Sequence, residues 1–555
     1  MRVKAKSGGL VVQAVAGTHV VLLGWDIEGP ELEAGLLGFS IRRTDETENE
    51  TYWLRGMKTF PGTQPPLPPG GTASSQQAPF QTFQWGDYSA KPAHEYTYTL
   101  TALYGRPGAL VEGVSVTIAI ATEKEEDGTH SVYFNRGAIA SQEYARQFQD
   151  KAPDVVGDAA YAWLSRGLLE AITGFVAKAL DPSFGLRVAI YEFQWPAILD
   201  ALHAAAGRGV SVSVIFDAIE NAQEDPVRKN EEAIEKAGIG TLCRGFTHGK
   251  IMHNKFMVLL KDGKPVEVLT GSTNYTENGI FGHLNCAHVV SDPEVAQVYL
   301  DYWSQLSEDP ELATMRRWDD EKTPSPANPP AVGVAQVFSP QTGTATLQRY
   351  ADIAASAQHA LFMTFAFGMN KDFLPAYGQD DGVLRFALMD KVGTGRNLAQ
   401  AQQQIDAIRK IPGTVVAIGQ NITLNSFDRW LKERDGLAPG EHVRWVHTKF
   451  MLVDPLSDDP IVITGSANFS DASIETNHEN MLVIRGNTRV ADIYLGEFMR
   501  QFSSYAFRDA AYDAQHGGQA ADFKPQDLAT DASWINRYKQ AGSSGALRKT
   551  YFSGE

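Results

Sequence analysis

Two short stretches of the sequence place histidine, lysine and asparagine at matching positions. The first covers residues 253–286 and begins His-Asn-Lys, and the second covers residues 447–480 and begins His-Thr-Lys. Aligned without a gap, the stretches also match Gly-Ser-Thr-Asn with Gly-Ser-Ala-Asn. A pattern repeated at equal internal spacing is rarely chance, so the sequence predicts a duplicated half-domain.

Each stretch puts its histidine two positions before its lysine, as in His253 with Lys255 and His447 with Lys449. Side chains two positions apart in a strand point to the same face, so each pair projects together. One such pair alone is weak evidence, because residues 248–250 also read His-Gly-Lys. The duplicated turn at the same distance favours a chemical role over simple packing.

Two halves that face each other would bring two lysines and two side-chain amides together. Ammonium groups and amide N–H donors form a site for an anion such as a phosphate. The serines of the two turns extend the same set of donors. The residues expected to bind phosphate are Lys255, Lys449, Asn274, Asn468, Ser272 and Ser466.

The two histidines supply the remaining groups for covalent phosphoryl transfer. One imidazole can attack phosphorus, and the other, when protonated, can donate to the leaving oxygen and later activate water. Zinc binding is the rival interpretation of clustered histidines. It is disfavoured because lysine is not an ordinary zinc ligand and the sequence lacks the expected cysteine or carboxylate spacing. We therefore expect neither a metal nor another cofactor.

The second stretch also resembles a known family. Residues 447–454 read His-x-Lys-x4-Asp and, with Gly-Ser-Ala-Asn-Phe-Ser at 465–470, resemble the signature of the phospholipase D superfamily. The resemblance extends over the regions 160–300 and 335–505. It implies two α/β halves related by a pseudo-two-fold axis, with one active site between them. The reaction that it implies is phosphodiester hydrolysis or transfer through a phosphohistidine.

The first stretch departs from that signature at one position. Leu260 stands where the second stretch has Asp454, and Asp262 comes two positions too late to replace it. The family's aspartate is usually structural, so we assign Asp454 to structural support. Its loss from the first stretch does not exclude activity, because both histidines, both lysines and both asparagines are kept.

Two polar residues near the ends of the stretches are expected to orient the histidine rings. Glu479 aligns with Asn285, and from position alone we expect Glu479 to partner His447 and Asn285 to partner His253. A carboxylate favours the protonated imidazole, so His447 is the expected general acid and His253 the expected nucleophile. The candidate catalytic residues are His253, Lys255, Asn274, Asn285, His447, Lys449, Asn468 and Glu479.

Length and composition restrict the class of protein. A chain of 555 residues with 43% hydrophobic residues predicts about three globular domains. Two cysteines, Cys243 and Cys286, argue against a disulfide scaffold and fit a reducing compartment. We find no bilayer-length apolar run and no convincing signal peptide, so we expect a cytoplasmic protein, with signal-independent export left open. The net charge of −17 disfavours general nucleic-acid binding but not a local basic cleft.

Residues 1–122 differ in pattern from the rest of the chain. They consist of short β-branched and aromatic runs separated by Gly- and Pro-rich turns, which predicts an all-β domain. Trp25 on an early run and Tyr96 and Tyr98 on a late run resemble a fibronectin type III sandwich, with another β-sandwich as the alternative. We expect these aromatic residues in the core, and a protein or glycan as the partner of this domain.

The remaining chain alternates strands and helices, which predicts parallel α/β structure. The expected fold class is therefore α/β, with two phospholipase D-like halves preceded by an all-β sandwich. The expected boundaries are 130–306 for the first half, 307–333 for a linker, 334–505 for the second half and 506–555 for a C-terminal tail.

The leading functional hypothesis is a phosphodiesterase of the phospholipase D type. A phospholipid substrate is slightly favoured by the acidic chain and by the two halves being fused, as in the family's phospholipases and lipid synthases. DNA or RNA is the alternative, since the second stretch is most similar to the family's small bacterial endonucleases. A third hypothesis is an inactive scaffold that binds phosphorylated ligands, and it rests on the altered first stretch.

Overall fold

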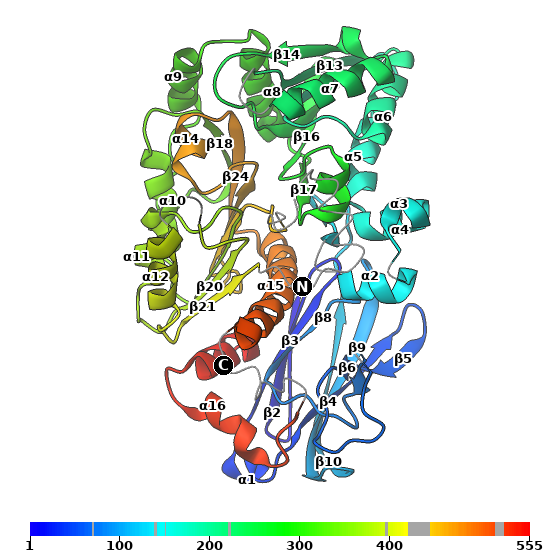
Figure 1. Cartoon of the computed structure of the whole chain (residues 1–555), viewed down its shortest axis with the longest axis vertical. Coiled ribbons are helices and arrows are strands. Elements are labelled where there is room, and N and C mark those ends of the chain that lie inside the picture. The colour runs from blue at the N-terminus through cyan, green and yellow to red at the C-terminus, as the bar shows by residue number, and fades with distance from the viewer. Residues whose placement is uncertain are drawn as a thin grey trace.

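The computed structural model of the chain contains three β-sheet regions that follow one another in sequence. It describes residues 1–68, 71–137, 141–149, 151–219, 224–393, 398–419, 445–516 and 527–555. In Figure 1, an N-terminal β-sandwich lies at the bottom, the first α/β half at the upper right and the second α/β half at the left.

The N-terminal region is a β-sandwich, as the sequence predicts. Within the described chain it contains two four-stranded antiparallel sheets. Trp25, Tyr96 and Tyr98 are buried in its core, also as expected. The first sheet has the order β1 (Arg2–Ser7), β2 (Leu10–Ala16), β3 (Val21–Ile27), β8 (Gln84–Asp87), and the second has β10 (Ala109–Ala121), β9 (Glu95–Arg106), β4 (Gly38–Asp45), β5 (Glu50–Trp53). The short elements between them are α1 (Pro30–Glu33), β6 (Arg55–Gly56) and β7 (Ala73–Ser74).

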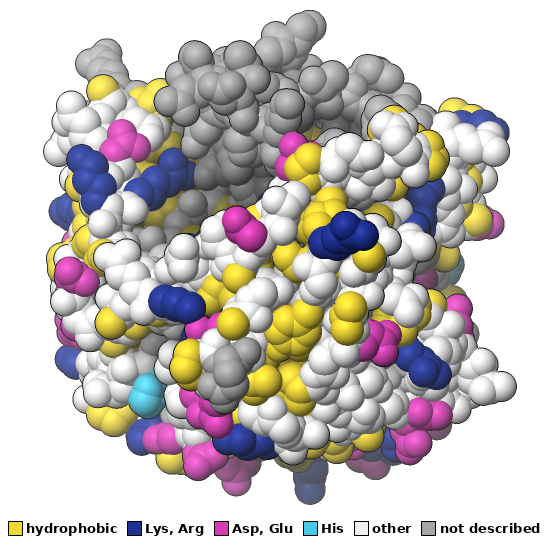
Figure 2. Space-filling model, turned by 90° about the horizontal axis from the view of Figure 1, so that it is seen from below, with side chains coloured by type: hydrophobic (Ala, Val, Ile, Leu, Met, Phe, Trp, Pro, Cys, Tyr) yellow, Lys and Arg dark blue, Asp and Glu magenta, His cyan; other side chains and the backbone are white. Residues whose placement is uncertain are grey.

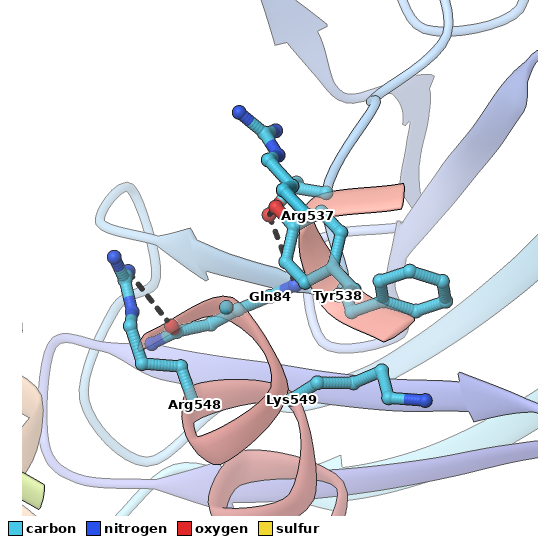
Figure 3. A pocket seen from close by; sticks show the side chains of 8 residues that line it. Gln84, Arg537, Tyr538, Arg548 and Lys549 are labelled. Atoms are coloured by element: carbon cyan, nitrogen blue, oxygen red, sulfur yellow. Dashed lines mark hydrogen bonds between the residues drawn. The ribbon is translucent and has the colours of Figure 1, made fainter. Parts of the chain in front are cut away.

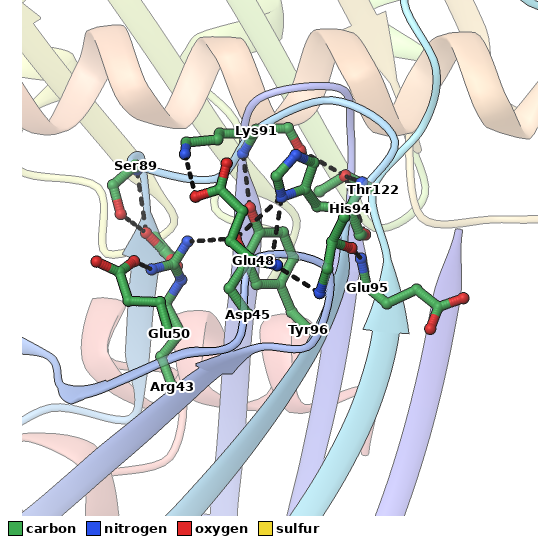
Figure 4. Close-up of polar contacts among 12 residues, drawn as sticks. Arg43, Asp45, Glu48, Glu50, Ser89, Lys91, His94, Glu95, Tyr96 and Thr122 are labelled. Carbon is green, nitrogen blue, oxygen red and sulfur yellow. Dashed lines mark hydrogen bonds and ion pairs between the residues drawn. The ribbon is translucent and has the colours of Figure 1, made fainter.

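A buried arginine connects the two sheets of the sandwich. Arg43 on β4 is 2% exposed, and its Nε lies 3.0 Å from Oδ2 of Asp87 on β8. Its neighbour Asp45 also accepts from Nδ1 of His94 at 2.9 Å, as Figure 4 shows. A buried guanidinium requires such carboxylates, because an unpaired charge in the interior is strongly destabilising. These contacts therefore fix how the sheets face each other.

The first α/β half is built on a seven-stranded mixed sheet within the described residues. Its strand order is β11 (His130–Phe134), β17 (Cys286–Val290), β16 (Lys264–Gly271), β15 (Lys255–Lys261), β12 (Phe184–Ile190), β13 (Ser211–Asp217), β14 (Cys243–Phe246). Its helices are α2 (Ser141–Phe148), α3 (Pro153–Val156), α4 (Asp158–Ser165), α5 (Leu168–Ala177), α6 (Pro196–Gly207), α7 (Glu224–Ala237) and α8 (Pro293–Ser307).

The second half repeats this arrangement in the part of the chain that is described. Its strand order is β18 (Gly333–Ser339), β24 (Glu479–Arg485), β23 (Ile461–Gly465), β22 (Phe450–Val453), β19 (Ala360–Phe365), β20 (Leu384–Met389), β21 (Thr414–Ile418). Its helices are α10 (Ala345–Ala355), α11 (Leu374–Tyr377), α12 (Leu398–Ile408), α14 (Asp471–Glu475) and α15 (Thr488–His516).

The two sheets match strand for strand, in order and in direction. In each, two parallel pairs lie at one side, β12–β13–β14 or β19–β20–β21, and the remaining pairs are antiparallel. Helices α8 and α15 follow the equivalent strands β17 and β24, and each packs on its own sheet and reaches the other half. One hydrophobic core runs through both halves. The duplication predicted from the sequence is therefore a structural duplication.

Two segments contain more structure than the sequence predicts. Helix α9 (Leu312–Lys322) lies inside the expected linker 307–333 and buries Met315. The expected C-terminal tail begins inside α15, and its described end forms α16 (Asn536–Lys539) and α17 (Ser544–Ser553). Trp534 is part of the core of the sandwich, and its Nε1 donates to the carbonyl of Leu36 at 2.9 Å. These residues complete the N-terminal region rather than trail from the second half.

The surface seen from below mixes all types of side chain. Acidic and basic residues are interspersed with apolar ones on this face, so the acidic excess is not gathered there as one patch (Figure 2).

Among the described helices, none combines the length and the apolar character that crossing a membrane requires.

Candidate active site

The two repeated histidines lie at equivalent places in the two sheets. Each precedes a central strand, β15 for His253 and β22 for His447, and each is followed by its lysine. The histidines are 7% and 5% exposed, and both lysines are 1% exposed. Nζ of Lys255 donates to the carbonyl of His253 at 2.6 Å, and Nζ of Lys449 donates to that of His447 at the same distance. Both pairs therefore have the same local geometry.

The partners of the histidine rings come from the opposite half in each case. Nδ1 of His253 lies 2.8 Å from Oε2 of Glu479, and Nδ1 of His447 lies 2.9 Å from Oδ1 of Asn285. The expectation that Glu479 partners His447 and Asn285 partners His253 is therefore wrong. Each ring is oriented by the other half, so the two histidines belong to one arrangement.

Backbone contacts across the pseudo-two-fold axis explain this exchange. Ile251 forms a parallel bridge with Asn477, and Leu284 forms one with Val446. These bridges lie one or two residues from the paired side chains. Each bridge joins the segment that precedes a histidine to the segment that precedes the acceptor residue of the opposite half. Each histidine therefore lies beside the acceptor of the opposite half and not beside that of its own half.

A network of buried amides and hydroxyls lies beside the pair formed by His253 and Glu479 and fixes the position of both residues. Nδ2 of Asn480 donates to Oδ1 of Asn254 at 2.8 Å, and Nδ2 of Asn254 donates to the hydroxyl of Tyr302 at 3.1 Å. The Oδ1 of Asn480 accepts from the hydroxyls of Thr270 and Tyr299. Asn254 and Asn480 directly follow His253 and Glu479 in the chain. The sequence gives one sign of this network, because the residue after His253 and the residue after Glu479 are both asparagine.

The hydrogen bonds also determine which ring nitrogen is free. The carboxylate of Glu479 is an acceptor, so Nδ1 of His253 carries the proton. The amide of Asn285 is fixed by its Nδ2, which donates to the carbonyl of Gly279 at 2.7 Å, so its oxygen accepts from Nδ1 of His447. In both neutral rings, Nε2 is then left with a lone pair. Each ring can act as a nucleophile or a base through that atom.

Burial disfavours the protonated, positively charged forms of the histidines and of Lys255. It lowers the pKa of His253 to about 4, although Glu479 opposes this shift. Burial, together with the charge of Lys449, holds the pKa of His447 well below its usual range. The pKa of Lys255 is lowered to about 8 by burial. A site of this kind favours an anionic ligand, whose charge would restore the protonated forms.

The two turn serines are buried and hydrogen-bonded to residues of the neighbouring strand. Ser272 is fully buried, and its hydroxyl donates to Oδ1 of Asn285 at 2.8 Å. Ser466 is also fully buried, and its hydroxyl accepts from the backbone N–H of Asn480 at 3.0 Å. Both hydroxyls are engaged with the neighbouring strand, and their role in phosphate binding stays a prediction. They support the residues that orient the histidines.

The turn asparagines lie in unequal surroundings. Asn274 donates to the carboxylate of Glu192, which follows β12. The strand register shows that the residue equivalent to Glu192 in the second half is Phe367, which follows β19. Asn468 is partly exposed. The acidic neighbour makes the two ends of the site chemically different. Glu192 cannot be found from the repeat, since the second half has Phe367 at the equivalent position.

Two further aspartates hold the loops that carry the histidines. Asp217 ends β13, and its Oδ1 accepts from the backbone N–H of Met252 at 2.6 Å. Asp390 follows β20, and its Oδ1 accepts from the N–H groups of Trp445 and Val446 at 2.8 and 3.1 Å. A signal was present in the sequence, because the apolar runs 210–217 and 383–390 both end in aspartate.

Asp454 and Asp262 directly follow the equivalent strands β22 and β15 of their halves, and their backbones have similar φ. The carboxylate of Asp454 accepts three N–H bonds from residues 358–360, and its own N–H donates to Ala360. The N–H of Asp262 likewise donates to the carbonyl before β12, at Ser183, and both aspartates have positive φ. Strand β15 ends two residues further from its histidine than β22 does, so the aspartate that follows the strand is displaced by the same two residues.

No metal cluster accompanies these groups in the described ranges, where no set of three or more His, Cys, Asp or Glu side chains has suitable geometry. The charged groups around the histidines are the two lysines and Glu479. The chemistry that the residues themselves can supply is proton transfer, nucleophilic attack and binding of an anion.

Comparison with known families gives a match over both halves. Residues 183–307 and 421–502 match the family model described as "Cardiolipin synthase, PLD-like domain". The chain carries a phospholipase D-like domain. Both histidine–lysine pairs of the phospholipase D-like domain lie inside the matched residues. No curated protein sequence matches the chain.

Solved structures give further likenesses to this phospholipase D-like domain. Nuc of Salmonella typhimurium, a phospholipase D family member, is 26% identical, with a TM-score of 0.22 over 25% of this chain and 87% of that chain. Phosphatidylserine synthase of Haemophilus influenzae is 12% identical, with a TM-score of 0.43 over 66% and 94%. Polyphosphate kinase of Porphyromonas gingivalis is 11% identical, with a TM-score of 0.38 over 56% of this chain and 42% of that chain.

Proposed function

We propose that the protein is a phosphodiesterase that works through a covalent phosphohistidine. The observation that carries this proposal is the exchange of partners between the halves. His253 and His447 each have Nδ1 fixed from the opposite half and Nε2 free, with a buried lysine beside each. Two such imidazoles in one site can divide the work of nucleophile and general acid.

The observed partners of the two histidines also favour His253 as the nucleophile and His447 as the general acid, but for a different reason. A ring that bonds phosphorus through Nε2 while Nδ1 keeps its proton becomes positively charged. Glu479 stabilises that charge on His253 for the lifetime of the intermediate. The amide of Asn285 gives His447 no such stabilisation, so a protonated His447 gives up its proton readily. We therefore assign His253 as the nucleophile and His447 as the general acid.

The reaction then takes two steps. Nε2 of His253 bonds to phosphorus as the ester P–O bond breaks, and the leaving oxygen takes the proton from Nε2 of His447. In the second step, His447 removes a proton from water, the water oxygen bonds to phosphorus and the P–N bond breaks. An alcohol in place of water gives transfer instead of hydrolysis. The anionic substrate itself favours the protonated form of His447 before the first step.

The phosphate is held by the positive and donor groups of both halves. Lys255 and Lys449 supply the ammonium groups, and Asn274 and Asn468 supply side-chain amides. These groups stabilise the charge that develops on the phosphoryl oxygens. Because they come in equivalent pairs, we expect them to contact the two non-bridging oxygens from opposite sides.

Phospholipid is the substrate class that we place first. The matched family model is described as a cardiolipin synthase domain, which favours a lipid diester. Nucleic acid is the second candidate, favoured by the aromatic ring of Tyr191, whose centroid lies 4.9 Å from that of His253. An aromatic ring beside the scissile phosphate is suited to stacking on a base. The scaffold hypothesis comes third, because both stretches keep their histidine, lysine and asparagine.

Hydrolysis of bis(4-nitrophenyl) phosphate tests the reaction without choosing a natural substrate. We expect release of 4-nitrophenol by the wild type, loss of release in His253→Ala, which lacks the nucleophile, and normal release in His203→Ala, whose ring lies on α6. Activity should survive exhaustive chelation, because the lysines supply the positive charge. No release by folded wild type, or activity restored by zinc or magnesium after chelation, would contradict the proposal. Labelled phospholipid and labelled DNA or RNA then decide the substrate class.

A further inference from the structure

A polar cavity is lined by residues that are distant in sequence from both catalytic motifs. It has a volume of about 350 Å³ and is formed where β8 of the sandwich meets α16 and α17. Figure 3 shows Arg537 and Arg548 among its lining residues, together with Gln84, Tyr538 and Lys549. Ligand cavities in proteins are about 300–1,000 Å³, so this one is large enough for a small metabolite.

The two arginines of this cavity lack acidic partners in the described part of the chain. Arg537 donates to the carbonyl of Gln81 at 2.8 Å, and Arg548 donates to Oε1 of Gln84 at 3.2 Å. Lys549 differs, because its Nζ pairs with Asp26 at 2.7 Å. In Figure 3, Lys549 extends away from the two guanidinium groups. The cavity thus holds two positive charges that the neighbouring carboxylate does not neutralise.

The two arginines differ in how far they are buried, since Arg537 is exposed and Arg548 is not. Arg548 is partly buried, and its guanidinium lies 5.7 Å from the ring centre of Phe386 on β20. Burial lowers the pKa of Arg548, and the like charge of Arg537 acts in the same direction. Solvent screens the charge of the exposed Arg537, so the cost falls on the partly buried Arg548, and an anion bound in the cavity would offset it.

We propose that this cavity is a second anion site that binds a small phosphate-bearing metabolite. The planar guanidinium fork of either arginine matches the oxygens of a phosphate group. Phe83 and Tyr538 line the same cavity and offer aromatic surface to the rest of the ligand. The site contains none of the repeated motif residues, so it is independent of the proposed catalytic site.

The position of the site suggests what binding would do. Its lining comes from the sandwich and from the C-terminal helices, and Arg548 also rests on a strand of the second half. A ligand held by both arginines would therefore connect the sandwich to the phosphodiesterase region through α17. Binding should stabilise the whole chain, because a ligand that binds only the folded state raises its stability.

Titration of the full chain with inorganic phosphate tests the proposal. We expect Arg537→Gln to weaken this binding about tenfold, as the loss of a charge-assisted hydrogen bond predicts. The matched control is Lys539→Gln, which removes the same charge from the same segment but outside the cavity. Arg548→Lys keeps the charge and loses the fork, so it should also bind less tightly. Equal phosphate binding by the wild type, Arg537→Gln and Lys539→Gln would overturn the proposal.

Phosphate at the proposed catalytic site is measured separately, as inhibition of diester hydrolysis. We expect Arg537→Gln to leave this inhibition unchanged, because the two sites share no residue. Binding that depends on Arg537 but occurs without any inhibition would support the second site while counting against the catalytic proposal. Inhibition with no dependence of phosphate binding on Arg537 would have the opposite meaning.

Discussion

Replacing Glu479 by glutamine removes the charge beside His253 but keeps the shape of the side chain. The pair is buried, and the carboxylate oxygen lies 2.8 Å from Nδ1, so the charge acts at short range with little screening. A hydrogen bond to a charged group contributes about 1.5–3 kcal/mol. If this stabilisation is lost from the transition state of the first step, the rate of that step should fall about 10- to 150-fold. The loss should appear as slower formation of the phosphohistidine.

The choice of leaving group separates this effect from a defect in the general acid. With 4-nitrophenol, which needs little protonation, Glu479→Gln should still be slow, whereas Asn285→Ala should be nearly as fast as wild type. With an alkanol leaving group, both variants should be slow. Glu475→Gln on α14 is the matched control and should keep full activity. If Glu479→Gln were slow only with the alkanol, Glu479 would serve the general acid, and the assigned roles would be reversed.

Three further predictions concern the shared site and its surroundings. His253→Ala and His447→Ala should each abolish hydrolysis, whereas half the activity in either variant would indicate two separate sites. The plot of kcat/KM against pH should fall as pH rises through about 8, because Lys255 then loses the proton that makes it a cation; Lys255→Arg, if active, should lack that fall. Deletion of residues 1–122 should lower the Tm or prevent folding, since Trp534 loses its packing, and an intact Tm would contradict this.

The sequence predicted the duplication because both copies keep the residues that chemistry needs. It could not predict the partners of the histidines. An alignment shows that Glu479 and Asn285 are equivalent, but not on which side of a symmetry axis each one lies. In this fold the strands that precede these residues meet the opposite half, so the equivalent residues exchange partners. Which pairs form is a property of the packing between the halves, not of the spacing within them.

The regions outside the repeat were harder to predict for a different reason. Helix α9 has a polar sequence and buries only a small part of its surface, so its apolar pattern is weak. The C-terminal residues are also polar, and Trp534 gives little indication that it packs more than 400 positions away, against Leu36. Local periodicity carries no information about such long-range contacts. The strands of the sandwich, with buried aromatic residues at alternate positions, were predicted well.

The most direct test of the whole account is to trap the covalent intermediate. Wild-type enzyme is quenched during turnover of a diester, the phosphohistidine bond is preserved by alkaline handling of the denatured chain, and the modified peptide is identified by mass spectrometry. We predict a phosphoryl adduct on His253 and its absence from Glu479→Gln quenched at the same early time. An adduct on His447 alone would reverse the roles. Turnover with no histidine adduct at any time would contradict the covalent mechanism itself.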